Sequence, residues 1–360
     1  MTVLYLGFKE GLMRVDVDGR RAKANWCFRN AETFSVAVDP KDSRYVYATT
    51  IGQGVFRSDN GGRTFEQTMA GLNSPLVFAS SVSASERTNA GGVLYVGTMP
   101  SAMYRSEDGG RTFRELESFQ DLPGLQEAAW PPTPATHMIH MIATSFNREA
   151  TVMAGIELGG VARSNDGGET WEKTEGGADC HQLLFHPLAP DRVYESDGAG
   201  FVESRDNGDT WALDFTGIPE EFAYFYDMAV DPGDPDNVLI TTGWNQYQAH
   251  GINPYAYQKG FYQGAFNRND TLAETYSTIY RRQGDNAWKE VREGLLAPQG
   301  HELGRFATAV GDDKGTLYYV TIPGDIYRTK DGGDTWSKLD VEYPADAEQL
   351  MLHVARATKE

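Results

Sequence analysis

Histidines, carboxylates and tyrosines precede several short apolar segments at corresponding positions, and these side chains are the best suited to chemistry. Four of the seven histidines belong to this set. Its members are Glu32, His137, His140, His181, Tyr224, Tyr226, Asp227, His301 and Glu302. Neutral imidazoles from several strands, together with a carboxylate, suit one divalent transition metal such as zinc, iron or manganese. Three protein ligands with one open position would polarise a substrate or acidify a bound water.

This metal hypothesis gives each residue a role. The predicted metal ligands are His137, His181 and His301, and the predicted catalytic residues are Glu32, Tyr226 and Glu302. Glu32 would be a fourth ligand or the general base, and Tyr226 the proton donor. His140 and Asp227 are predicted to contact the substrate. In the alternative interpretation, each histidine bonds backbone or water in a polar channel that holds no metal.

A short sequence that recurs along the chain indicates the elements that must position these residues. It has the form Ser/Thr-x-Asp-x-Gly-x-Thr-Trp/Phe, with an Asn in place of the Asp in the first copy. The copies are RSDNGGRTF at 57–65, RSEDGGRTF at 105–113, RSNDGGETW at 163–171, ESRDNGDTW at 203–211 and RTKDGGDTW at 328–336. We call this recurring sequence the box motif.

Each residue type of the box motif suits a tight hairpin turn. The acidic or amide side chain and the Ser can bond turn backbone, the Gly adopts a conformation closed to other residues, and the aromatic residue anchors the hairpin. We therefore predict a structural, non-catalytic role for Asn60, Asp108, Asp166, Asp206 and Asp331.

The box motif resembles the Asp-box, or BNR repeat, of sialidases, sortilin-type receptors, xyloglucanases and the photosystem II assembly factor family. The resemblance implies a β-propeller, in which each repeat forms one blade. Each repeat ends with an aromatic residue, and the seven such residues predict seven blades: Trp26, Phe65, Phe113, Trp171, Trp211, Trp288 and Trp336. Two apolar strands precede each box hairpin, so we predict four-stranded blades and a single domain over 1–360.

The two chain ends complete one blade. The N-terminus (about 1–30) offers three strands without a first one, and the C-terminus (about 347–357) offers one more. We predict that this last strand closes an all-β, seven-bladed ring, because closure removes exposed sheet edges.

Two segments exceed the repeat length, at about 118–136 and 243–276. The propeller resemblance places both on the top face, opposite the box motifs, together with the histidines. The second is rich in aromatic residues, and Trp244, His250 and Tyr257 are predicted to contact the substrate. It would be a lid or a pocket wall, or else a self-packed loop or an oligomer contact. His186 is expected at the opposite end, and His353 fits either role.

Composition limits the partners. A net charge of -19 repels phosphate backbones and anionic lipids, so we expect neither nucleic acid nor a membrane as a partner. The N-terminus lacks the basic and apolar regions of a signal peptide, which favours a cytoplasmic protein. Cys27 and Cys180 are too few for a disulfide framework or a cysteine metal site.

These features favour a metal-assisted hydrolase or lyase that acts on a small polar or aromatic molecule. Sialidase activity is improbable, since the sequence shows neither an FRIP-type motif nor a clear set of three clamping arginines. Xyloglucanases use a cleft between two propellers, whereas this chain holds one. The alternative is a non-catalytic propeller that binds carbohydrate or takes part in protein assembly.

Overall fold

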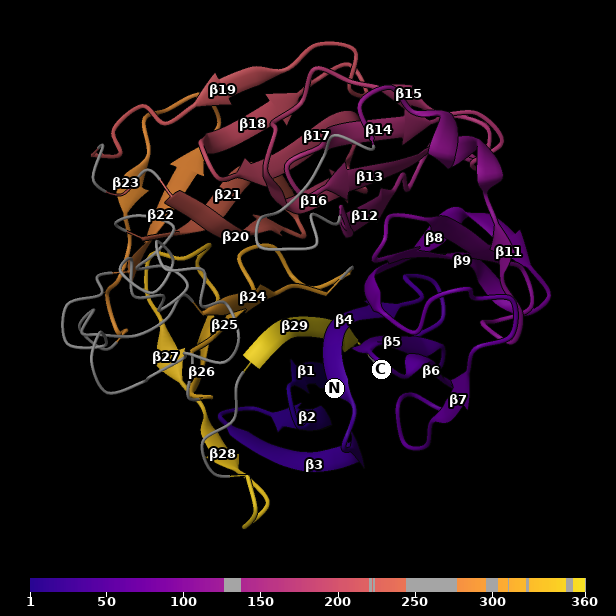
Figure 1. Ribbon diagram of the computed structural model, residues 1–360. Helices are drawn as coiled ribbons and strands as arrows, with labels where there is room; N and C mark the ends of the chain where they lie inside the picture. Colours follow the sequence, from indigo (N-terminus) through magenta and orange to yellow (C-terminus); the bar gives the residue numbers. More distant parts are fainter. Residues whose placement is uncertain are drawn as a thin grey trace, which may run out of the picture.

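The chain folds into seven antiparallel sheets arranged as blades around a central channel (Figure 1). The computed structural model describes residues 1–125, 137–219, 222, 224–243, 277–295, 304–309, 311–321, 324–347 and 352–359. The predicted seven-bladed β-propeller is confirmed. The described part of the chain contains no helix long and apolar enough to cross a membrane.

Each blade runs from the channel outward in four strands. Blades 1 to 3 contain β29 (Leu352–Lys359), β1 (Thr2–Phe8), β2 (Gly11–Asp18) and β3 (Arg21–Arg29); β4 (Glu32–Val38), β5 (Val46–Ile51), β6 (Gly54–Ser58) and β7 (Glu66–Thr68); and β8 (Val77–Thr88), β9 (Gly91–Thr98), β10 (Met103–Ser106) and β11 (Arg114–Glu115). Blades 4 and 5 contain β12 (Ile139–Thr144), β13 (Val152–Ile156), β14 (Gly160–Ser164) and β15 (Glu172–Lys173); and β16 (Cys180–His186), β17 (Ala189–Asp197), β18 (Gly200–Ser204) and β19 (Ala212–Asp214). Blades 6 and 7 contain β20 (Tyr224–Asp231), β21 (Asp234–Gly243), β22 (Ser277–Gln283) and β23 (Lys289–Glu290); and β24 (Arg305–Ala307), β25 (Leu317–Val320), β26 (Ile326–Thr329) and β27 (Ser337–Lys338). One short 3-10 helix, η1 (Glu117–Asp121), follows blade 3.

The hydrophobic core consists of layers between neighbouring blades. Seven clusters of buried residues each join one blade to the next, from the layer between blades 1 and 2 to the one between blades 7 and 1. The layer between blades 2 and 3, for example, packs Tyr47 and Val55 against Leu94 and Tyr104. Because every blade contacts two neighbours, its apolar surface is covered only in the closed ring.

The ring is closed by pairing between the chain ends, as predicted. β29 pairs antiparallel with β1, from Thr2 opposite Lys359 to Phe8 opposite Leu352. One further strand was not predicted: β28 (Asp340–Glu342) pairs parallel with the outer edge of β3, so the sheet of blade 1 has five strands.

The box motifs form the hairpin turns between the third and fourth strands. In blade 3, Asp108 Oδ1 accepts hydrogen bonds from the Ser106 hydroxyl (2.8 Å) and the Thr112 N–H (2.9 Å), and Asp108 Oδ2 accepts from the Thr112 hydroxyl (2.6 Å). The Ser106 hydroxyl oxygen accepts from the N–H of Gly110, whose φ of 78° favours glycine. Equivalent bonds recur around Asn60, Asp166, Asp206 and Asp331.

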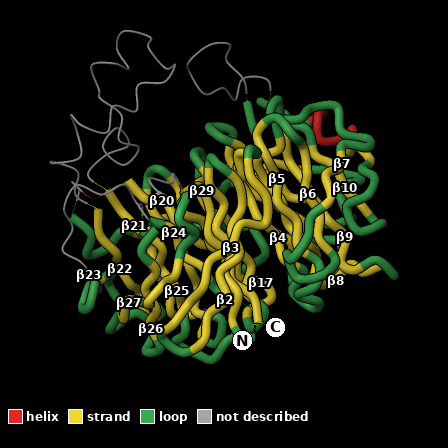
Figure 2. Tube along the Cα trace, turned by 90° about the horizontal axis from the view of Figure 1, so that it is seen from below, coloured by secondary structure: helices red, strands yellow, loops and turns green. Residues whose placement is uncertain are grey.

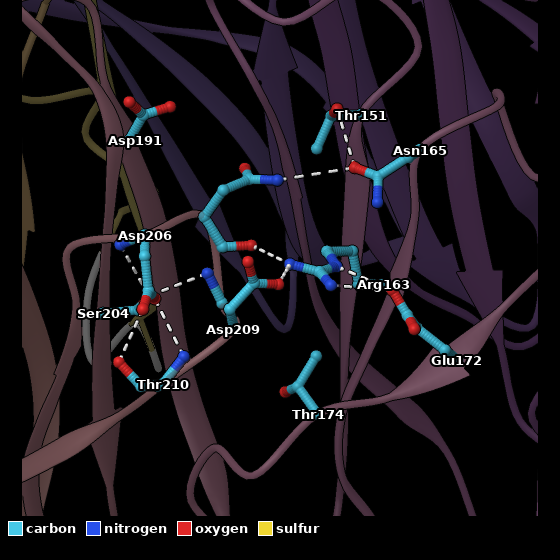
Figure 3. A network of polar contacts seen from close by, with 12 residues as sticks. Thr151, Arg163, Asn165, Glu172, Thr174, Asp191, Ser204, Asp206, Asp209 and Thr210 are labelled. Carbon is cyan, nitrogen blue, oxygen red and sulfur yellow. Dashed lines mark hydrogen bonds and ion pairs between the residues drawn. The ribbon is translucent and has the colours of Figure 1, made fainter.

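An arginine links successive box turns. Arg57 Nε donates to Gly109 O (2.7 Å) and Arg105 Nη1 donates to Gly167 O (2.9 Å), so each arginine, one residue before the box Ser, bonds the turn of the next blade. Arg163 donates to Asn207 O in the same way, beside the box turn of Asp206 (Figure 3). In blade 5 Glu203 takes the arginine's position and accepts from Arg282 Nη2 (2.7 Å), because blade 6 lacks a box motif.

The box turns define the bottom face, and the first strands begin at the opposite, top face. Both chain ends lie at the bottom (Figure 2). In blade 6 the strands β21 and β22 are paired up to Gly243 opposite Ser277, at their top ends. The residues between Gly243 and Ser277, like 126–136, lie outside the described part of the chain.

Deletion of residues 352–360 should abolish ring closure. The loss of β29 uncovers the edge of β1 and the layers between blades 7, 1 and 2, which should cost a large part of the about 5–15 kcal/mol that stabilises a folded domain. Thermal unfolding followed by circular dichroism checks this, with Lys359→Ala, an exposed position on the same strand, as the control. A deletion variant that unfolds as cooperatively and at the same temperature as the full chain would contradict it.

Candidate active site at the top of the channel

All seven blades contribute to one cavity at the top of the channel. Its volume is about 70 Å³. One side chain near the start of each first strand lines it: His353 of blade 1, Phe34, Phe78, His140, His181, Tyr226 and, from blade 7, Arg305. Strand entries that are distant in sequence therefore converge on one small space, as the strand alignment predicted.

His140 and Glu157 form the first of three histidine–carboxylate pairs at this cavity. Glu157 follows β13 of the same blade, and its Oε2 lies 3.1 Å from His140 Nδ1. The carbonyl oxygen of Cys180 lies at the same distance from Nδ1. Since a carbonyl can only accept, Nδ1 carries the proton, and Nε2 of neutral His140 keeps its lone pair.

His181 and Asp179 form the second pair, in blade 5. His181 Nδ1 donates to Phe225 O (2.6 Å), while Nε2 lies 3.1 Å from the Tyr224 hydroxyl and 3.4 Å from Asp179 Oδ2. Burial lowers the pKa of His181, but the bond to Asp179, aided by its charge, outweighs burial and raises it overall. Both ring nitrogens of this predicted metal ligand thus have protein partners.

His353 and Glu32 form the third pair, across the closed ring. His353 Nε2 lies 3.0 Å from Glu32 Oε1, although the two residues are 321 positions apart. The hydrogen bond from His353 lowers the pKa of Glu32, so this carboxylate is ionised at neutral pH. Phe34 lies between this pair and the first, with ring centroids 5.5 Å from His353 and 5.9 Å from His140.

Arg305 is placed against Tyr226. Its Nη2 donates to the Tyr226 hydroxyl oxygen (2.7 Å), its Cζ lies 4.0 Å from the centre of the tyrosine ring, and its Nε donates to His353 O (2.7 Å). The predicted proton donor Tyr226 is therefore held next to a cation. Arg305 Nη1 is buried and has no hydrogen-bond partner among the described residues.

Asp227, a predicted substrate contact, is fully engaged within the protein. Its Oδ1 accepts from Gln182 Nε2 (2.9 Å) and its Oδ2 from the Phe306 N–H (2.6 Å), so it joins the first strands of blades 5, 6 and 7. Only 5% of the residue is exposed, and burial raises its pKa. The sequence alignment placed Asp227 at the channel but could not reveal that both oxygens are occupied.

The predicted metal ligands are only partly described. His137 Nδ1 accepts from the Ser101 N–H (3.2 Å) at the boundary of blades 3 and 4, and His137 does not line the cavity. Burial lowers its pKa. Five predicted site residues lie outside the described residues: His301, Glu302, Trp244, His250 and Tyr257. Within the described part of the chain, no three His, Cys, Asp or Glu residues are grouped so as to hold a metal.

Sequence reasoning named Glu32 but missed the other two carboxylate partners and the arginine. Glu157 follows a second strand, and Asp179 stands two residues before His181, but neither position repeats between blades. Arg305 is the first residue of β24 and stands directly before the buried Phe306 and Ala307, which is a visible signal. His353 could be recognised only by placing the last strand in register with the first.

A further carboxyl group, Glu195, is buried beneath the second pair. Its Oε2 accepts from the Gly177 N–H (2.9 Å), and its Oε1 has no partner among the described residues. Burial raises the pKa of Glu195 to about 8, so the group is protonated at neutral pH.

Protonation of Glu195 predicts that stability falls with rising pH. The unfolded chain releases this proton near pH 4.3, whereas the folded chain holds it until about pH 8, so the free energy of unfolding should decrease between these values. His181, with its raised pKa, acts in the same sense at higher pH. Glu195→Gln should flatten the profile measured by urea unfolding from pH 5 to 9, and exposed Glu169→Gln should not. An unchanged slope in Glu195→Gln would contradict this assignment.

Comparisons with known proteins support the fold. No family model matches the chain, and no curated protein matches it in sequence. Among solved structures, the chain is similar to the GH74 xyloglucanase from Xanthomonas campestris (TM-score 0.63, 17% identity, 99% of this chain and 52% of that chain). It is also similar to RRP9 WD40 repeats (0.56, 8%, 98% and 88%) and to YCF48 bound to a D1 peptide (0.52, 14%, 86% and 82%). The chain spans about half the length of the xyloglucanase chain, and identities this low establish the propeller fold alone.

Proposed function

We propose that the protein is a hydrolase or lyase that acts on a small polar or aromatic molecule at the top of the channel. The observation that carries this proposal is the convergence of three histidine–carboxylate pairs around one cavity of about 70 Å³. A carboxylate that orients a histidine and stabilises its protonated form is a recurrent arrangement for general acid–base catalysis.

His140 is the best placed general base. Its Nδ1–H is donated to Cys180 O, which orients the ring, and the Glu157 carboxylate, 3.1 Å from Nδ1, would stabilise the positive charge after proton uptake. Its ring centroid lies 6.1 Å from that of His181, which with its raised pKa suits the role of proton donor.

The remaining lining suits an aromatic or polar substrate that develops negative charge. Phe34 and Phe78 pack edge to face, with centroids 4.9 Å apart, and offer an apolar wall. Arg305, with Tyr226 beneath it, offers a fixed positive charge that would stabilise an oxyanion. Glu32, already ionised, positions His353 in this scheme.

The metal-assisted form of the reaction would require a change in the contacts of one site residue, His181. A metal ion would polarise the substrate or its water, with His137, His181 and His301 as proposed ligands. His181 would bind it only by giving up the contacts of Nε2 with Tyr224 and Asp179. The acid–base scheme above does not depend on that rearrangement.

The alternative is a non-catalytic propeller. The similar structures include an enzyme, the GH74 xyloglucanase, and a complex, YCF48 bound to a D1 peptide. A binding propeller would need no oriented histidines, so the three pairs favour the enzyme.

Replacement of His140 should abolish turnover. Screening the protein against p-nitrophenyl acetate, p-nitrophenyl phosphate and small aromatic glycosides should give a substrate whose kcat/KM falls about 10²–10⁴-fold in His140→Gln and less in Glu157→Gln. His186→Gln is the matched control, because His186 donates to Asp231 O at the bottom of the channel. Equal rates in His140→Gln and the unaltered chain would overturn the proposal. Binding of a peptide or glycan without turnover of any substrate would favour the alternative.

The metal-assisted form predicts about one equivalent of a divalent transition metal in protein purified without chelator. Elemental analysis should show this metal retained in His186→Gln and lost in a folded His301→Ala variant. Because a ligand bound only by the folded state raises its stability, a chelator should also lower the unfolding temperature. Absence of metal under every loading condition, with activity intact, would leave the acid–base form and eliminate the metal.

A further inference from the structure

The middle of the channel carries an arginine that forms no ion pair with the part of the chain that the structure describes. Arg356 lies on the ring-closing strand β29 and lines both the top cavity and a second cavity of about 310 Å³ that extends to the bottom face. Met141, Gln182, Leu184 and Thr308 share this position between the two cavities. These five residues form what we call the channel waist.

Arg356 is half-buried and lacks the partners that fully buried arginines of this protein have. Among the described residues its side chain makes one hydrogen bond, from Nε to Val36 O (3.2 Å), and no carboxylate lies within ion-pair distance. Arg282 and Arg57, by contrast, pair with Glu203 (2.7 Å) and Glu66 (2.8 Å). Burial lowers the pKa of Arg356, and the charge of Asp227 only partly offsets this effect.

A half-buried guanidinium without a counter-ion has donors left over, and proteins commonly satisfy such donors with an anion or water. Asp227 does not serve as the counter-ion, since both of its oxygens already accept from Gln182 and the Phe306 N–H. The two Nη groups of Arg356 have no hydrogen-bond partner among the described residues, so their donors are available to a ligand in the channel.

Neutral donors line the same two cavities as the guanidinium. Thr308 borders both cavities, and the hydroxyls of Ser35 and Ser80, 2.9 Å apart, lie on their walls. Hydroxyl groups next to a guanidinium are suited to the several oxygens of a small oxyanion.

The charges along the channel favour the same kind of ligand. Above the waist, Arg305 has no carboxylate partner among the described residues. Below it, Lys41 and Lys359 line the lower cavity; Lys359 is paired with Asp312 (3.5 Å), while the carboxylates Asp39 and Asp42 of the same cavity are paired with Arg87 and Arg44. Among the described residues Lys41 belongs to no ion pair, so an anion entering from the bottom would meet its positive charge, although the whole chain carries a net charge of -19.

We propose that the channel waist binds a small oxyanion, a phosphate, a sulfate or the carboxylate of an organic molecule, on Arg356 with Thr308 and the Ser35–Ser80 pair. The site is distinct from the histidine–carboxylate pairs and does not rest on the catalytic proposal. A carboxylate-bearing substrate would, however, reach Arg356 from the top cavity, because Arg356 lines that cavity as well.

Isothermal titration tests the proposal on the full chain. Inorganic phosphate, sulfate and acetate are titrated separately, with chloride keeping the ionic strength constant, so that a free inorganic oxyanion is distinguished from a carboxylate. We expect saturable binding of at least one of them, weakened about tenfold or more in Arg356→Gln and to a smaller extent in Thr308→Val. Exposed Arg20→Gln is the matched control, and His140→Gln should bind as the unaltered chain does.

Thermal unfolding gives a second readout that does not need a measurable heat of binding. The bound oxyanion should raise the unfolding temperature of the unaltered chain and of Arg20→Gln, but not that of a folded Arg356→Gln. General salt effects of phosphate and sulfate would act on all three alike. No binding of any of the three anions by the unaltered chain, or an equal response in Arg356→Gln, would overturn the proposal, as would a matching loss of binding in His140→Gln.

Discussion

The pairing of β29 with β1 is the constraint on which the rest of the molecule depends. It joins the last strand of the chain to the first, and so gives the layers between blades 7, 1 and 2 their missing wall. The same pairing delivers His353 and Arg356 to the channel, with Arg356 opposite Tyr5 in the register. Closure therefore both stabilises the ring and supplies two of the side chains that line the channel.

The side chains at the two faces of the propeller have different roles. At the bottom, the box turns and the arginines between them make a repeated set of hydrogen bonds that fixes each blade to the next. The bond from the Thr210 hydroxyl, with others of its turn, lowers the pKa of Asp206 to about 2, so this carboxylate stays ionised and bound in its turn. At the top, each first strand is free to carry a different side chain, and the seven that meet there include three histidines.

Much of the fold was predictable because it repeats. Five box motifs and seven closing aromatic residues predicted the blade number, and two incomplete chain ends predicted the closure. The fifth strand of blade 1 was not predictable, since β28 is three residues long and pairs with β3 outside the repeat. His140, His181 and Tyr226, which the alignment of the first strands placed at strand entries, line one cavity.

The pairings of those residues do not repeat, which is why the sequence could not predict which side chains would meet. Glu32 and His353 meet only through ring closure, and Glu157 reaches His140 from the end of β13. Asp227 shows the reverse: its position aligned with the site, but its oxygens hold neighbouring strands together. A repeat predicts where a strand begins, whereas the bonds of a side chain depend on the blade beside it.

The central claim is that His140, His181 and His353 border one cavity, each held by a carboxylate. Long-range nitrogen–proton NMR spectra of protein labelled with ¹⁵N in the histidine rings test it most directly, recorded against pH with and without His140→Gln. The account predicts a proton on Nδ1 of neutral His140 and of His181, and a shifted titration of His181 when the neighbouring His140 ring is removed. A titration of His181 that does not respond to the loss of His140 would contradict it.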